Sequence, residues 1–363
     1  MSDRCVSEDF VTSYKKARRR KIALVLAMGL IAIVAFGLSL SFGGRDIGFL
    51  DAYRILFDHI AGAAMEPGSS AWTDDYILWE VRLPRGLFAL TAGATLAVCG
   101  AVMQSVLRNP LADAYTTGVS SGACLGVAVA TVLGISVTGS NDVYDIGTMI
   151  NAFVFSLIPI IFIISIAPYL ERSPASLILA GVAITYIFNS FDTLLLVLTD
   201  SESLADIYVW QVGTVSGVYW NDLPLVIGVC IPAMVAMGLL SNRLNIMSIG
   251  DAGAKSLGMN VDNLKTLTLV VTAFAVSVIV CNAGILGFIG LIVPHLIRIA
   301  TNADNRFLIP ASAMMGAVLL IGADVVSRVL SPQGAVPVGV VISFIGAPIM
   351  LYLILRRGSA VYR

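Results

Sequence analysis

Long stretches without a charged side chain dominate this chain. Asp, Glu, Lys and Arg are absent from seven runs of at least 20 residues: 22–42, 86–107, 114–141, 146–170, 223–242, 266–297 and 329–355. About 20 apolar residues are needed to cross the hydrocarbon core of a bilayer. The pattern therefore predicts an all-α integral membrane protein.

Glycine, proline and polar residues divide the apolar runs into about ten transmembrane helices: 22–42, 84–107, 115–135, 147–169, 175–199, 222–241, 264–281, 286–300, 307–330 and 337–356. The run 266–297 is too long for one ordinary crossing, because a helix rises about 1.5 Å per residue. Asn282, Gly284 and Gly287 supply a break inside it. Non-helical backbone at membrane depth is tolerated where it is buried in protein or lines a cavity, so we expect this break near a pathway.

Composition supports a membrane protein and limits the domain organisation. The chain is 58% hydrophobic and 12% charged, whereas soluble domains are about 25% charged. The N-terminal apolar run is longer than the apolar core of a secretory signal, about 7–15 residues, so we expect it to be retained. We predict a cytoplasmic tail at 1–21, one transmembrane domain at 22–357 with a cytoplasmic loop at 242–263, and a second cytoplasmic tail at 358–363.

The basic residues orient the chain, since cytoplasmic loops carry an excess of Lys and Arg. With the N-terminus cytoplasmic, 17 of the 22 Lys and Arg residues fall on the inside. Both termini are then cytoplasmic, which requires an even number of spans. The remaining five are predicted outside: Arg45, Arg54, Arg82, Arg85 and Arg328.

The sequence offers no constellation for catalysis. A phosphate-binding loop G-x-x-x-x-G-K-[ST] is not matched by residues 253–256, which read Gly-Ala-Lys-Ser. The five cysteines lie far apart and there are only two histidines, which argues against a metal site. Asp192 and Asp324 are candidate carboxylates within spans, and membrane-embedded carboxylates are typical of ion-coupled carriers. An ion- or proton-coupled secondary transporter therefore stays open as an alternative.

The loop 242–263 carries a predicted short helix at 249–257. Ser248 and Asp251 match the spacing of a capping box, and Gly258 is a plausible terminator. The helix would be amphipathic; its residues and flanks are Ser248, Ile249, Asp251, Ala254, Lys255, Leu257 and Gly258. Such a helix suits docking of a cytosolic partner, and an interfacial helix lying on lipid is the alternative.

Arg82 and Arg85 lie at the outer start of the second span, against the topological preference, and Arg328 lies near the outer end of the ninth span. Arginine at membrane depth is costly, and guanidinium suits bidentate recognition of carboxylates. The arginines predict an outer docking site for an acidic partner, with local pairing to Glu80 or Asp324 as the alternative.

Several long motifs resemble one family in order along the chain. The stretch RLPRGLFALTAGATLAVCGAVMQSVLRNPLADAYTTGVSSGACLG (82–126) resembles permeases of type II ABC importers for iron chelates, haem and vitamin B12. The same holds for LNIMSIGDAGAKSLGMNVDNLK (244–265), GILGFIGLIVPHLIRIATNADNRFLIP (284–310) and PVGVVISFIGAPIMLYLILRR (337–357). The resemblance covers roughly residues 76–357.

This resemblance implies the type II ABC importer permease fold, with ten helices in each of two permease subunits, in a bacterial or archaeal cell membrane. The partners would be a second permease (an identical copy or a paralogue), two cytosolic ATPases and an extracytoplasmic solute-binding protein, and no nucleic acid. ATP and Mg²⁺ would be used by the ATPases, with no cofactor on this chain. A ferric siderophore is the first expectation for the cargo, followed by haem and a corrinoid.

The resemblance also assigns residues. Arg82, Arg85 and Arg328 match arginines that receive acidic residues of the binding protein. Asn109 and Leu111 match a cytoplasmic gate, and Pro174 and Ala175 replace small hydroxyl residues in the second gate segment, 173–176. The helix at 249–257 matches the element that docks in the ATPase.

Overall fold

The computed structural model describes residues 2–45, 47–62, 66–169, 174–330 and 336–361, and in these ranges it contains helices and no strand. The α-helices are α1 Ser2–Ser41, α2 Phe49–Ile60, α3 Ser70–Tyr76, α4 Leu83–Val106, α5 Val119–Leu133, α6 Ile146–Ile166, α7 Pro174–Val197, α8 Ser201–Val212, α9 Leu223–Leu239, α10 Ser241–Met247, α11 Asp251–Ser256, α12 Val261–Ala283, α13 Ile289–Thr301, α14 Asn305–Leu330 and α15 Val338–Val361. A π-helix, η1 (Ile77–Arg82), joins α3 to α4, and two 3₁₀ turns are η2 (Ala114–Thr117) and η3 (Ala167–Tyr169).

Each of the ten predicted spans coincides with a helix. Six helical segments among the described residues are long and apolar enough to cross a membrane, and α9 with α10, bent by 54°, would make a seventh. Three shorter apolar helices, at 119–133, 289–301 and 338–353, account for the rest. The prediction of an all-α integral membrane fold is confirmed.

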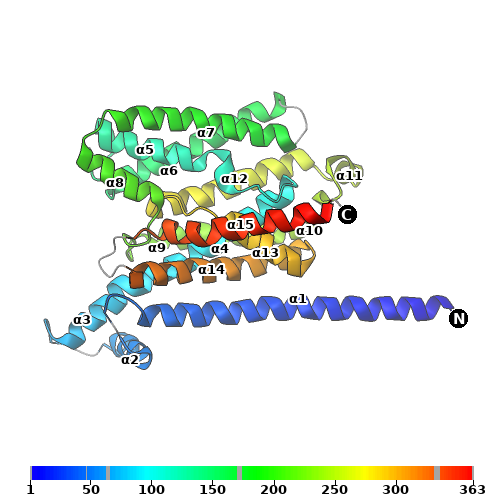
Figure 1. Ribbon diagram of the computed structural model, residues 1–363, viewed down its shortest axis with the longest axis horizontal. Coiled ribbons are helices and arrows are strands. Elements are labelled where there is room, and N and C mark those ends of the chain that lie inside the picture. The colour runs from blue at the N-terminus through cyan, green and yellow to red at the C-terminus, as the bar shows by residue number, and fades with distance from the viewer. Residues whose placement is uncertain (1, 46, 63–65, 170–173, 331–335, 362–363) are drawn as a thin grey trace.

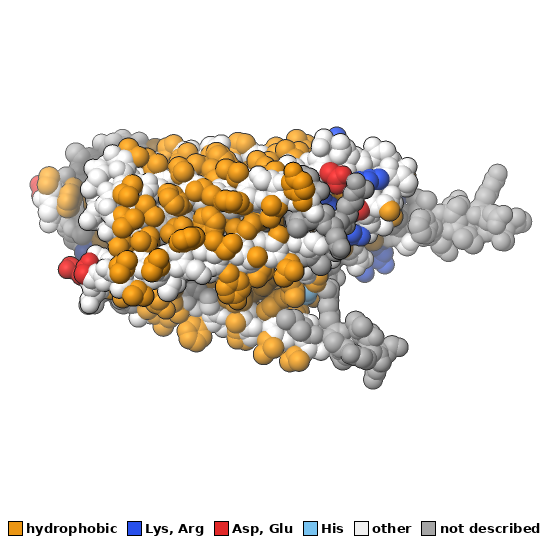
Figure 2. Space-filling model, turned by 90° about the horizontal axis from the view of Figure 1, so that it is seen from above, with side chains coloured by type: hydrophobic (Ala, Val, Ile, Leu, Met, Phe, Trp, Pro, Cys, Tyr) orange, Lys and Arg blue, Asp and Glu red, His pale blue; other side chains and the backbone are white. Residues whose placement is uncertain are grey.

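The spans run side by side, as Figure 1 shows, and the two ends of the bundle differ. One end holds α11 together with the N-terminal end of α1 and the C-terminal end of α15, and we call it the α11 end. The other holds α2 and α3, and we call it the α2 end. Figure 2 shows a broad apolar surface between these ends, with the charged side chains gathered at either side of it.

The helix α4 lies at the centre of the bundle, with nearly every side chain buried. Glycines let its neighbours approach closely. A Cβ on Gly93 would meet the Gly316 carbonyl in α14, and one on Gly100 would meet the Gly290 carbonyl in α13. Such small-residue contacts drive helix association where lipid removes the hydrophobic effect. By contrast, large apolar side chains on α1 and α7 are exposed.

The predicted break inside the run 266–297 is confirmed. Helix α12 ends at Ala283, α13 begins at Ile289, and Gly284 and Phe288 adopt positive φ angles of 68° and 67°. Residues 2–21 continue α1 as one helix, and α15 extends through Val361; the cytoplasmic location of the two tails stays a prediction. An apolar span and its flanking residues share one helical backbone because nothing in the flank breaks it.

Candidate functional site: a polar linkage at the α11 end

The predicted loop helix is present but shorter than expected, as α11. The capping-box prediction was wrong, because Ser248 closes α10 and its hydroxyl donates to the Asn245 carbonyl at 2.7 Å. Gly250 precedes α11 instead, at φ 105°. The terminator was predicted correctly: the Gly258 N–H donates to the Lys255 carbonyl at 2.9 Å and Met259 N–H to Ala254 at 3.1 Å. These two bonds form a Schellman motif, with Gly258 in the left-handed region at φ 80°.

Two large apolar side chains flank α11 and face outward. Ile249 and Leu257 are each 65% exposed, whereas Ala254 is fully buried against Met247, Val261 and Leu264. The helix is thus held to the protein by one face and leaves apolar surface free on another. Lys255 points elsewhere and pairs with Asp262 at 2.8 Å.

Asp251 joins α11 to the loop that follows α4. Its Oδ1 lies 3.2 Å from Arg108 Nη2, and its Oδ2 pairs with Lys265 at the start of α12. Arg108 has a positive φ of 48°. Three residues on, the Leu111 N–H donates to Asn109 Oδ1 at 2.9 Å, and the Leu111 side chain is 49% exposed. The predicted gate residues Asn109 and Leu111 therefore lie on a loop that is tied electrostatically to α11.

The second predicted gate segment is only partly visible. Residue 173 lies outside the described residues, and Pro174 begins α7. The side chains of Pro174 and Ala175 also lie outside what the structure describes. Their assignment to a gate stays a prediction.

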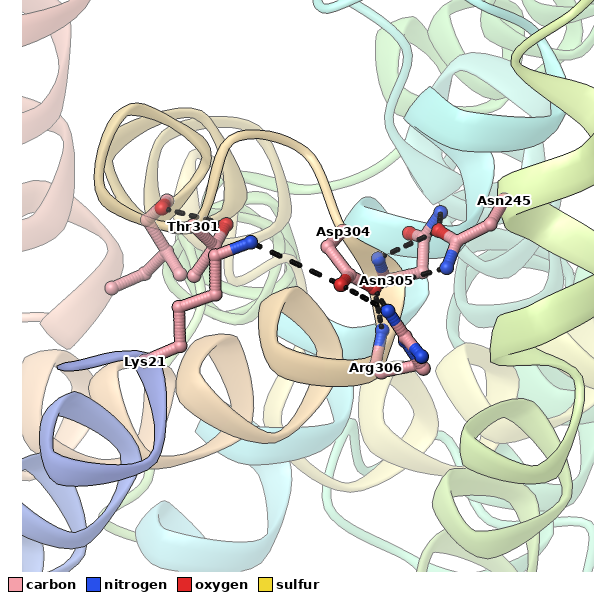
Figure 3. Close-up of polar contacts among 7 residues, drawn as sticks. Lys21, Asn245, Thr301, Asp304, Asn305 and Arg306 are labelled. Atoms are coloured by element: carbon pink, nitrogen blue, oxygen red, sulfur yellow. Dashed lines mark hydrogen bonds and ion pairs between the residues drawn. The ribbon is translucent and has the colours of Figure 1, made fainter. Parts of the chain in front are cut away.

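A second polar linkage, which sequence reasoning missed, connects α10 to α4 through Asn305; Figure 3 shows the contact between Asn245 and Asn305. The Asn245 side-chain oxygen accepts from the Asn305 backbone N–H at 2.8 Å and from its Nδ2 at 2.9 Å. The Ser105 hydroxyl, one turn before the loop at 108–111, donates to Asn305 Oδ1 at 2.8 Å. The helix preceding α11 is therefore hydrogen-bonded through Asn305 to the end of α4.

Asp304 extends this linkage. It accepts from Asn245 Nδ2 at 3.0 Å and from Arg306 Nη2 at 2.8 Å, and Lys21 of α1 lies 3.9 Å away (Figure 3). Partial burial raises its pKa, but the hydrogen bonds from Arg306 and Asn245 outweigh burial and lower the pKa to about 2. Asp304 is therefore ionised at any physiological pH. In the sequence, the polar residues at 302–305 between two spans are the feature from which this linkage could have been predicted.

The three arginines at the α2 end are buried and have partners within the chain. Arg85 Nε lies 2.6 Å from Asp324 Oδ1, and Arg328 Nη2 lies 3.0 Å from Asp324 Oδ2. Arg82 donates to the carbonyls of Leu40 at 2.7 Å and Ser41 at 2.8 Å. The alternative of local pairing to Asp324 is thus confirmed for Arg85 and Arg328. Docking of an acidic partner stays a prediction.

A mainly apolar cavity of about 680 Å³ lies beside the break between α12 and α13. Its lining includes Gln211 of α8, Ile285, Phe288, Ser343 and Phe344. Gln211 also donates to Asp192 of α7 at 3.1 Å, so this candidate carboxylate has a neutral partner. Among the described residues, no group of three His, Cys, Asp or Glu side chains is arranged to hold a metal ion.

Several known proteins are similar in sequence to this chain over most of its length. The hemin transport system permease HmuU of Yersinia pestis is 34% identical over 333 residues, 92% of this chain and 96% of the relative. The vitamin B12 import system permease BtuC of Klebsiella pneumoniae is 36% identical over 279 residues, 77% of this chain and 82% of the relative. An ABC transporter permease assigned in Methanocaldococcus jannaschii is 36% identical over 357 residues, 96% of this chain and 98% of the relative.

The fold has counterparts among solved structures. An inward-facing ABC transporter of the metal-chelate type superposes with a TM-score of 0.77 at 27% identity, covering 92% of this chain and 99% of that one. A model of the FecCD transport family matches residues 31–356. The chain therefore belongs to the FecCD transport family of ABC transporter permeases.

Proposed function

We propose that this chain is the permease subunit of an ABC importer that moves an iron chelate into the cytoplasm by ATP-driven alternating access. The observation that carries the proposal is α11, with Ile249 and Leu257 exposed beside it and Asp251 paired to Arg108 of the loop at 108–111. A partner can push on the exposed face, and the ion pair passes the displacement to the loop.

In this proposal the α11 end is cytoplasmic, in keeping with its basic residues. Two ATPase subunits dock there and use ATP and Mg²⁺, while this chain itself carries no cofactor and no ATPase site. The exposed apolar side chains of α7, including Tyr186, Phe191 and Leu194, suit contact with a second permease subunit, either an identical copy or a paralogue. The membrane is the bacterial or archaeal cell membrane.

Movement follows from the contacts that α11 makes. ATP binding draws the two ATPases together and shifts α11, and the permease then changes its preference between outward-open and inward-open states. Asp251 carries the shift to Arg108 and hence to Asn109 and Leu111. Asn245 of α10, which precedes α11, is hydrogen-bonded to Asn305 and is thereby connected to α4.

The arginines at the α2 end support docking of a binding protein through their summed charge. Asp324 pairs with Arg85 and Arg328, while Arg82 donates to backbone carbonyls, so one carboxylate faces three guanidinium groups. This cluster alone therefore carries net positive charge, which favours an acidic side chain of a partner placed directly over it.

A ferric siderophore is the first choice of cargo, with haem and a corrinoid next. The cavity beside Ile285 and Phe288 is mainly apolar with few polar groups, which suits passage of a bulky chelate without tight retention. The names of HmuU and BtuC point to haem and vitamin B12 as cargo of those relatives.

The test is uptake into membrane vesicles that contain the chain, its ATPase and its binding protein. We expect uptake of a ferric siderophore to require internal ATP and to persist with a proton uncoupler. Uptake that stops with the uncoupler and ignores ATP would instead establish the ion-coupled secondary transporter. Haem and cobalamin, tested in the same vesicles, identify the cargo.

A further inference from the structure

The helix α2 has three distinct faces. Ala52, which is fully buried, packs with Ile55 and Leu56 against Leu40 of α1 and Leu78 of η1. His59 fixes the end of the helix, because its Nδ1 lies 2.8 Å from Asp75 Oδ1 and its ring stacks on Trp79 with centroids 4.1 Å apart. The orientation of α2 about its own axis is thereby set.

A second face of α2 is apolar and exposed. At about 100° per residue, its members fall within one continuous sector of the helix: Phe49 46%, Leu50 79%, Tyr53 42%, Phe57 71% and Ile60 69% exposed. The third face is polar, with Asp51, Arg54 and Asp58. The Arg54 side chain is 81% exposed. We call the second face the apolar stripe and the third the polar stripe.

The helix lies at the level where the first span ends. The Tyr53 hydroxyl rests against Gly37, at a point that a Cβ on Gly37 would occupy. Gly37 belongs to the membrane-spanning part of α1, Lys15–Ser41. In Figure 1, α2 lies beside the end of α1 and is seen nearly end-on, so its axis runs across the spans.

We propose that α2 is an interfacial anchor that lies flat in the bilayer surface at the α2 end. The apolar stripe is immersed at the boundary between headgroups and acyl chains, and the polar stripe faces water. A helix with a strongly apolar and a strongly polar face binds membranes in this way. Tyr53 takes the depth at which amphipathic rings are enriched.

Continuity with the lipid-facing surface identifies lipid as the occupant. Helix α1, on which α2 packs, exposes Leu26, Leu30 and Ile33 by 69%, 63% and 70%. At about 100° per residue these three residues share a face of α1 with Gly37, against which Tyr53 of the apolar stripe lies. The anchor also braces η1 through Leu78, and η1 ends at the buried Arg82. This inference needs only the membrane fold and does not depend on the cargo or the energy source.

The experiment places one cysteine at a time in the full chain reconstituted in lipid vesicles. Cys5 is replaced by serine, and the other four cysteines are buried. Adjacent pairs supply matched controls: Leu50→Cys with Asp51→Cys, and Phe57→Cys with Asp58→Cys. Each site carries a polarity-sensitive fluorophore, and quenching by brominated lipids is compared with quenching by aqueous iodide.

We expect the Leu50 and Phe57 sites to emit at shorter wavelength and to be quenched several-fold more by brominated lipid than their neighbours, with iodide giving the reverse order. Equal access of iodide to all four sites would overturn the anchor. Shielding of Leu50 and Phe57 only after addition of a binding protein or a second permease would also overturn it, and would make the stripe a protein interface.

Discussion

The carboxylate of Asp251 in α11 lies 3.2 Å from the guanidinium of Arg108, 143 positions earlier in the chain, measured from Oδ1 to Nη2. This contact links α11, which is flanked by the exposed side chains of Ile249 and Leu257, to the loop that carries Asn109 and Leu111. Lys265 pairs with the same carboxylate. Asp251 therefore joins α11 to two neighbouring elements, and in the proposed mechanism a displacement of α11 reaches both of them through it.

We predict that Asp251→Asn and Arg108→Gln each lower the number of chelates transported per ATP hydrolysed. Allosteric coupling of this kind amounts to about 5- to 150-fold. The pair is partly exposed, at 36% and 21%, and such pairs contribute about 0.2–1 kcal/mol to stability, so thermal stability should hardly change.

The double variant should lose no more coupling than the worse single variant, because both remove one interaction. Arg54→Gln is the control, since Arg54 forms an exposed ion pair with Asp58 in α2, away from α11. Additive losses, or an equal loss with Arg54→Gln, would contradict a specific role for the Asp251–Arg108 pair.

Leu257→Ser and Ile249→Ser should weaken retention of the ATPase during purification while leaving the permease folded. Burying a large aliphatic side chain contributes about 1.5–3 kcal/mol, so each change should reduce ATPase affinity by roughly ten- to a hundredfold. Ser256→Ala is the control, because its exposed hydroxyl only bonds to the Gly253 carbonyl. Unchanged co-purification in both variants would remove α11 from the docking site.

Gly100→Ala should destabilise the bundle, whereas Gly228→Ala should not. A Cβ at Gly100 collides with the Gly290 carbonyl, while nothing lies within 4 Å of one at Gly228 in α9. Helix propensity favours alanine over glycine by about 0.8–1 kcal/mol in both positions, so only the packing differs. Thermal unfolding in detergent should show a lower midpoint for Gly100→Ala alone, and similar midpoints would refute the close approach.

The buried cluster of Arg85, Arg328 and Asp324 predicts an order of stabilities. Asp324→Leu leaves two buried guanidinium groups facing each other, and breaking a buried pair in this way costs about 3–5 kcal/mol. Arg85→Met leaves the Asp324–Arg328 pair intact and should cost much less. Thermal unfolding checks the order, and an equal loss in the two variants would contradict it.

This cluster also changes how binding-protein docking is tested. Arg85→Glu would place a second carboxylate against Asp324, so lost uptake would combine a docking effect with misfolding. Arg85→Met, measured for binding-protein affinity and for stability together, separates the two. A reduced affinity for the binding protein with an unchanged midpoint of thermal unfolding supports docking at Arg85. An unchanged affinity for the binding protein contradicts it.

The apolar runs predicted the spans well because bilayer thickness fixes their length. The break at Gly284 was also readable, since 32 uncharged residues exceed one crossing. Helix α2 was missed because it is short and carries Asp51, Arg54 and Asp58. An interfacial helix needs no uncharged run.

The contacts of the candidate site were harder to predict. Arg328 and Asp324 are four residues apart on one helix, which made their pairing readable. Arg85 contacts the same carboxylate although 239 positions separate Arg85 from Asp324 in the chain. Asn245 and Asn305 are hydrogen-bonded across a separation of 60 positions. Only the three-dimensional packing brings such residues together. Ser248 has the right spacing to cap the N-terminus of α11, but its hydroxyl donates to the Asn245 carbonyl at the end of α10 instead.

The most direct test of the account is reconstitution from purified components, leaving out one at a time. Vesicles containing the permease, the ATPase and a binding protein loaded with ferric siderophore should take up iron when ATP is supplied on the α11 side. Omission of the ATPase or of the binding protein should abolish uptake. Uptake that continues without the ATPase would contradict the central claim.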